Sequence, residues 1–199
     1  NDEEKLKWFK TINIAGEKLT DQEIRNAIYS GAWVTQAKRR FSKSNCVAHK
    51  IASDFMNCKP IRQEYFETAL RWIADKQGKT LEQYMAEHQH DTDADELWQY
   101  FQDVIHWTDK LFGRKYKKEM KGVQWGLLYN QYRDTTLTAT AISAEVAQLM
   151  RDSDVERKSG IFSYIFDHDI RHLGIRTFDD NTKREIYEKQ NGICPLCGK

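Results

Sequence analysis

The chain has 199 residues and a formal net charge of +1, so it is long enough for one large domain or two small ones, and its total charge does not indicate a partner. A 40% hydrophobic content with 12% aromatic residues excludes a disordered composition. No stretch approaches the ~18 apolar residues of a membrane span, and none resembles a secretory signal, so we expect a cytoplasmic protein with no membrane partner.

The first predicted helix starts at Asp21, because Thr20 and Glu23 have the spacing of a capping box. Gly31 is expected to end this helix. Apolar residues then recur at helical spacing in several further stretches. Helices are predicted at about 34–42, within 46–56, at 61–77 after Pro60, and from residue 80 through 85.

The second half of the chain continues the same pattern. Helices are predicted at about 94–111, 122–132, 143–151, 159–166 and 180–191, with an irregular strand or linker at 172–178. No alternating pattern indicates a sheet. The expected fold is therefore all-α, a multi-helix orthogonal bundle of about seven to nine helices over residues 1–176, with a different module at 177–199.

Charge is distributed unevenly along the chain. The acidic segment holds eight carboxylates and no Lys or Arg: Glu82, Glu87, Asp91, Asp93, Asp95, Glu96, Asp103 and Asp109. Two basic runs are candidate nucleic-acid-binding residues: Lys38, Arg39 and Arg40, then Arg114, Lys115, Lys117 and Lys118. Such cations with interleaved aromatic rings suit phosphates and stacked bases. The alternative is a solvated face that neutralises the acidic segment.

Cys194 and Cys197 form a Cys-x-x-Cys knuckle, which supplies two of the four ligands of a structural zinc site. The expected cofactor is zinc at a site that this chain leaves incomplete. Cys46 and Cys58 are expected to be ordinary thiols. The acids near His88 and the group around His172 are interpreted as structural.

The knuckle and the helix before it resemble the entry to an HNH endonuclease domain that carries a four-cysteine zinc site. The resemblance rests on Lys183, Arg184, Tyr187, Gln190, Gly192, Cys194, Cys197 and Gly198. It implies metal-assisted hydrolysis of DNA by the intact protein, with a divalent ion such as Mg²⁺. The family's catalytic residues would follow the first Cys pair, so no catalytic residue is assigned in this chain.

A second resemblance, to GmrSD-type restriction endonucleases, rests on Asn13, Gly16, Glu23 and Arg25 together with the intervening Leu19 and Ile24. Ala15 stands where that family usually has a second glycine. The family joins a ParB-like nucleotide-binding region to a helical region and often an HNH nuclease. The motif residues would either contact an anion or dock the helical domain on its neighbour.

The two resemblances predict the helical, DNA-contacting middle of an HNH-type restriction and phage-defence endonuclease. The chain is expected to be a fragment cut at both ends, without the catalytic residues, and nucleotide dependence would reside in the parent protein. The alternative is a non-enzymatic helical interaction module, which would include a possible homodimer.

Overall fold

The computed structural model describes residues 4, 19–175, 180–193 and 198. In this part of the chain 67% of the structure is helical and no strand occurs, so the all-α prediction is confirmed there. Eleven α-helices are described, and ten of them, α2 to α11, lie within residues 1–176, where seven to nine were expected; a helix was predicted at the position of α4 but none at α8. The Cys-x-x-Cys knuckle lies outside the described residues.

The α-helices are α2 (Asp21–Ile28), α3 (Ala32–Phe41), α4 (Val47–Ala52), α5 (Glu64–Lys76), α6 (Leu81–His88), α7 (Asp95–Phe112), α8 (Lys117–Met120), α9 (Trp125–Tyr132), α10 (Ala139–Arg151), α11 (Ile161–Asp167) and α12 (Asp180–Lys189). Three short 3-10 helices, η2 (Pro60–Arg62), η3 (Lys158–Gly160) and η4 (Ile170–Leu173), connect them.

The predicted start of α2 is confirmed by its hydrogen bonds. The Thr20 hydroxyl accepts from the backbone N–H of Glu23, and the Glu23 carboxylate accepts from the backbone N–H of Thr20 at 2.7 Å. The end of α2 was predicted wrongly. The helix stops at Ile28, and Gly31 is the residue before α3, where an added Cβ would lie 2.6 Å from the backbone oxygen of Gln89.

The helix predicted at 61–77 is divided in two. Pro60 begins the 3-10 helix η2, and Gln63 then adopts a left-handed backbone conformation with φ of 66° before α5 starts at Glu64. The sequence gives no signal of this break, because the stretch 61–77 contains no glycine to interrupt the helical pattern. Other boundaries differ as well: α9 begins three residues later than predicted, α10 begins four residues earlier, and η4 occupies the start of the predicted linker.

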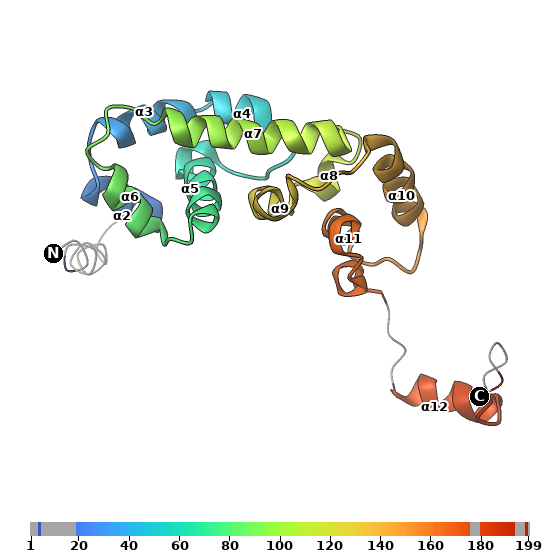
Figure 1. Ribbon diagram of the computed structural model, residues 1–199. Helices are drawn as coiled ribbons and strands as arrows, with labels where there is room; N and C mark the ends of the chain where they lie inside the picture. The colour runs from blue at the N-terminus through green and yellow to red at the C-terminus, as the bar shows by residue number, and fades with distance from the viewer. Residues whose placement is uncertain (1–3, 5–18, 176–179, 194–197, 199) are drawn as a thin grey trace.

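The 18-residue α7 is the longest helix that the structure describes, and helices from both halves of the chain pack on it (Figure 1). Its buried stripe is Leu97, Tyr100, Phe101, Val104, Ile105 and Thr108. At 1.5 Å per residue the helix is about 27 Å long, so its two ends face different neighbours. α3 and α5 pack against its first half, α9 packs along its middle from Tyr100 to Trp107, and α10 lies beside its later turns (Figure 1).

Aromatic rings fill the core on both sides of α7. In the first half the rings of Phe41 and Phe101 meet edge to face, with centroids 5.1 Å apart. In the second half Phe112 and Phe162 do the same at 5.3 Å. Large rings bury much apolar area each, which explains how a chain with 31% charged residues forms a continuous core.

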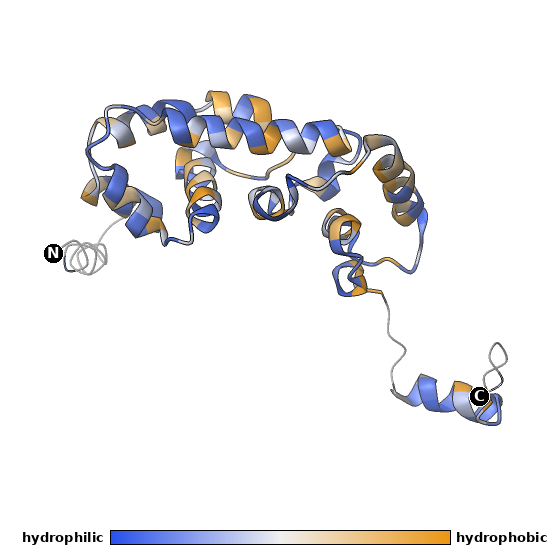
Figure 2. Cartoon of the chain, in the orientation of Figure 1, coloured by the Kyte–Doolittle hydropathy of each residue, from blue (hydrophilic) through white to orange (hydrophobic). Residues whose placement is uncertain are grey.

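Helix α12 differs from the rest of the described structure. Its described side chains are exposed apart from the half-buried Ile186, and Figure 2 shows it as largely hydrophilic. The predicted boundary at residue 176 falls among residues that are not described, and the division at that point stays a prediction. No described helix has the length and apolar content that crossing a membrane requires.

The contact between α5 and α9 is a close helix approach that a glycine makes possible. A Cβ added at Gly126 would lie 2.1 Å from the ring of Trp72, which is buried. Asn130, one turn further along α9, donates to the backbone oxygen of Trp72 at 2.9 Å and accepts from the Tyr100 hydroxyl of α7 at 2.7 Å. Gly126 and Asn130 therefore fix α9 against two helices.

We expect Gly126→Ala to destabilise the protein by about 1–3 kcal/mol, the usual cost of overpacking, despite the better helix propensity of alanine. The matched control is Gly122→Ala, whose added Cβ would have Ser159 Cβ 3.9 Å away as its nearest contact. Urea unfolding followed by tryptophan fluorescence measures both. Equal stability of the two variants would contradict the assigned packing at Trp72.

Candidate nucleic-acid interface

The first basic run lies in the last turn of α3, and its three cations have different surroundings. Arg40 donates to the Asp95 carboxylate at 2.5 Å and lies over the ring of Trp98, 5.8 Å from its centroid. Lys38 and Arg39 are exposed and form no ion pair or hydrogen bond within the described structure. Arg40 is therefore committed to α7, and the other two cations remain available to a ligand.

These two cations line a surface depression of about 290 Å³, which we call the basic hollow. Its lining residues are Thr35, Lys38, Arg39, Ser42, Lys43 and Gln63. None of them is acidic, and Lys43, like Lys38 and Arg39, has no described ion-pair partner. Three uncompensated cations around one depression produce a positive potential that attracts anions. Lys38 and Arg39 also complement the negative end of the α3 dipole.

Gln63 forms the inner wall of the hollow and was not identified from the sequence. Gln63 is only 9% exposed. Its side-chain oxygen accepts from the Ser42 hydroxyl at 2.6 Å and from Asn26 Nδ2 at 3.2 Å. A glutamine in a predicted helix carries no signal of such contacts, because its partners lie 21 and 37 residues away in the chain.

Two of the four cations of the second basic run are paired with carboxylates. Arg114 pairs with Asp109 at 2.8 Å and with Asp54 at 3.1 Å, and Lys117 pairs with Asp54 at 3.0 Å. The Lys117 hydrogen bond is the main cause that lowers the pKa of the Asp54 carboxyl, with a further contribution from Arg114 and an opposing one from burial. Lys115 lies over the Tyr116 ring at 5.3 Å, and Lys118 has no described partner.

The two basic runs lie at opposite ends of α7 rather than in one patch. Arg40 contacts Asp95 in its first turn, whereas Arg114 contacts Asp109 in its last turn. These two carboxylates are 14 residues apart, about 21 Å along a helix axis. Through Arg114 and Lys117 the second run fastens the segment after α4 to the end of α7, whereas the three cations of the basic hollow have no described ion-pair partner.

The motif residues that the structure describes make internal contacts. Glu23 caps α2, and Arg25 pairs with Glu82 at 2.7 Å and with Glu67 at 3.5 Å, with a side chain only 13% exposed. Arg25 therefore joins α2 to α5 and α6 and is not presented to a solvent anion. Asn13 and Gly16 lie outside the described residues.

The predicted zinc ligands Cys194 and Cys197 also lie outside the described residues. Among the residues that are described, no group of three His, Cys, Asp or Glu side chains is placed to hold a metal ion. His88 Nδ1 lies 2.7 Å from the Asp91 carboxylate, in agreement with a structural role. Burial is the main cause that raises the pKa of Cys58 to about 11, so this thiol is protonated at neutral pH.

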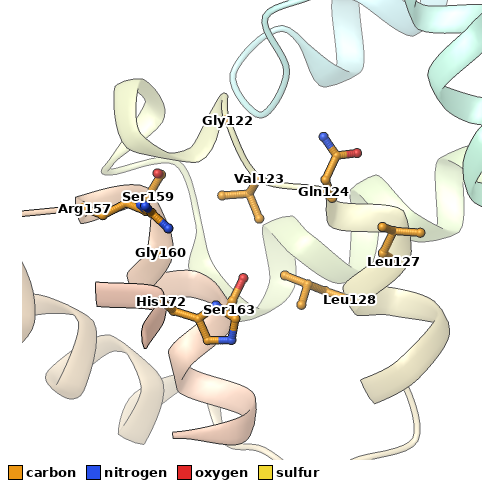
Figure 3. A pocket seen from close by; sticks show the side chains of 10 residues that line it. All are labelled: Gly122, Val123, Gln124, Leu127, Leu128, Arg157, Ser159, Gly160, Ser163 and His172. Carbon is orange, nitrogen blue, oxygen red and sulfur yellow. The ribbon is translucent and has the colours of Figure 1, made fainter. Parts of the chain in front are cut away.

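A second hollow of about 320 Å³ lies between α9 and the η3–α11–η4 segment (Figure 3). Leu127 and Leu128 lie on one side of it, with Ser163 and His172 on the other. His172 Nε2 pairs with the Asp167 carboxylate at 2.9 Å, which fixes the imidazole within its own segment. This hollow is lined by one Arg, and its charge is less positive than that of the basic hollow.

Comparison of the chain with protein families, with curated proteins and with solved structures finds no match in any of the three. The functional interpretation is therefore based on the residues and their geometry.

We expect Asp54→Asn to lower the free energy of unfolding by an amount that depends on pH. The folded-state pKa of this carboxyl is lowered below 3.8, so its contribution is fully present above the unfolded-state pKa and is lost as the pH falls through the folded-state value. The exposed positions of Arg114 and Lys117 limit the effect to about 1 kcal/mol.

Urea unfolding at several pH values measures this effect. We expect the difference in the free energy of unfolding between the wild type and Asp54→Asn to be constant from pH 5 to 7 and to disappear below about pH 4. A gap that stays unchanged at pH 3 would contradict the proposed ion pairs.

Proposed function

We propose that the helical body contacts DNA through the basic hollow, as the DNA-binding region of an HNH-type endonuclease. The single observation that carries the DNA contact is the presence of three cations, Lys38, Arg39 and Lys43, around one depression without acidic residues. None of the three has a described ion-pair partner, so their positive charges are uncompensated at one place on the surface. DNA attracts such a site through its phosphates.

The rest of the described surface supports the choice of this site. Arg25, Arg40 and Arg114 each donate to carboxylates, so their charges are already compensated. A phosphate would have to compete with those carboxylates at each arginine. At the basic hollow it meets no such competition. Lys115 and Lys118, about one α7 length away, would make secondary contacts to the same nucleic acid.

The cleavage chemistry is proposed on the strength of residues 183–198, which resemble the entry to an HNH domain. Such a domain would use a divalent ion to hydrolyse DNA, and its structural zinc would take Cys194 and Cys197 as two of four ligands. The restriction and phage-defence role and the nucleotide dependence follow from the resemblance of Glu23, Arg25 and their neighbours to GmrSD-type proteins.

The variant Lys38→Ala/Arg39→Ala should weaken binding to a short DNA duplex and make it less dependent on salt. Each phosphate contact contributes about 0.9 to the slope of log K against log salt, so the slope should fall by about 1.8. Fluorescence anisotropy at a series of salt concentrations measures both quantities.

The matched control is Lys110→Ala/Arg151→Ala, which removes the same net charge from α7 and α10. Equal losses of slope in the two variants would show a diffuse charge effect and would refute the assigned surface. No binding by the wild-type chain would favour the alternative, a helical interaction or dimerisation module, which analytical ultracentrifugation would then test.

A further inference from the structure

Four side chains form a buried hydrogen-bond chain that leads from α2 to the basic hollow. The Arg25 guanidinium donates to Gln22 Oε1 at 3.4 Å, and Gln22 Nε2 donates to Asn26 Oδ1 at 2.9 Å. Asn26 Nδ2 then donates to Gln63 Oε1 at 3.2 Å. Gln22, Asn26 and Gln63 are all buried polar residues, and polar side chains in such positions are costly unless they are paired.

Arginine can only donate hydrogen bonds, and this fixes the donor-to-acceptor direction of every bond in the buried hydrogen-bond chain. A guanidinium cannot accept a hydrogen bond, so Gln22 must turn its oxygen toward Arg25 and its amide nitrogen toward Asn26. The same constraint passes through Asn26 to Gln63. Ser42 reinforces it, because its hydroxyl donates to the same Gln63 oxygen at 2.6 Å. The oxygen of Gln63 is therefore held inward.

The Gln63 amide nitrogen is the end of this chain, and it has no described hydrogen-bond acceptor. It belongs to a residue that is about nine-tenths buried and that lines the basic hollow. The left-handed backbone of Gln63, with φ of 66°, is an uncommon conformation for a non-glycine residue, and such strain is concentrated at functional sites. Gln63 also precedes α5, whose amino end adds positive potential.

We propose that the basic hollow is a subsite for one phosphate group, in which Gln63 Nε2 donates to a phosphate oxygen while Lys38, Arg39 and Lys43 supply the charge. Gln22 and Asn26 are positioning residues that hold the Gln63 amide in its donating orientation. The inference rests on the proposed function for the source of the phosphate, which is the DNA backbone.

The chemistry of the hollow favours phosphate. A phosphodiester presents two nonbridging oxygens, which can accept several hydrogen bonds at once and match the two parallel N–H donors of a guanidinium. Lysines add charge from flexible side chains, and a fixed neutral donor adds direction. A metal cation would instead require acceptor oxygens, and the Gln63 oxygen that would serve is already bonded to Asn26 and Ser42.

The decisive variant is Gln63→Glu. One carboxylate oxygen would still accept from Asn26 and Ser42, so the buried hydrogen-bond chain is kept, whereas the other oxygen would place an acceptor and a negative charge in the hollow. The matched control is Gln36→Glu, the same chemical change on α3, at a residue that does not line the hollow. Thermal melting of both variants reports whether they fold.

We expect Gln63→Glu to weaken the affinity for a short DNA duplex by about tenfold or more, and Gln36→Glu by about threefold or less, because a lost charge-assisted contact costs more than a distant charge. Equal losses would refute the role of Gln63. A second measurement uses the wild-type chain and inorganic phosphate. The side-chain amide signal of Gln63 in ¹H–¹⁵N spectra should shift on titration, with smaller shifts for other glutamines.

The two measurements separate the two proposals. A Gln63 signal that phosphate leaves unmoved would overturn the phosphate subsite, even if the chain binds DNA through other cations. A signal that shifts in a chain that does not bind DNA would support the subsite and overturn the DNA-binding function.

Discussion

The structure depends on the single apolar stripe of α7. An 18-residue helix offers one such stripe, and both halves of the chain bury their aromatic side chains against it. Phe101 meets Phe41 in the first half of the helix, and Phe112 meets Phe162 at its last residue. Because the helix is longer than any neighbour, its ends are chemically independent, and the two basic runs of the sequence become two separate surfaces.

Ion pairs decide which of these surfaces is available to a ligand. Exposed ion pairs contribute little to stability. Their main consequence here is that the paired cations are less available to a ligand. Arg40 and Arg114 hold opposite ends of α7 through Asp95 and Asp109. The acidic segment thus pairs with one cation of each basic run, and Asp54 pairs with Lys117 as well as with Arg114. The cations without a described ion-pair partner include the three of the basic hollow, and also Lys115 and Lys118.

The buried hydrogen-bond chain gives a physical role to Arg25, one residue of the motif that resembles GmrSD-type proteins. The sequence left open whether these residues contact an anion or dock a domain. Arg25 itself is paired with Glu82, so it does not meet an anion directly. Through Gln22 and Asn26, however, it sets the orientation of the Gln63 amide. A residue committed to internal pairing thereby influences a surface that is 38 residues further along the chain.

The sequence by itself determined the helical class, most helix positions and the capping box of Thr20 and Glu23, because these depend on neighbours within a few residues. It also identified Lys38 and Arg39. Only the tertiary structure separated these free cations from the committed Arg114, and only it placed Gln63 beside them. Both results depend on partners tens of residues distant, and local periodicity carries no information about which distant side chains meet.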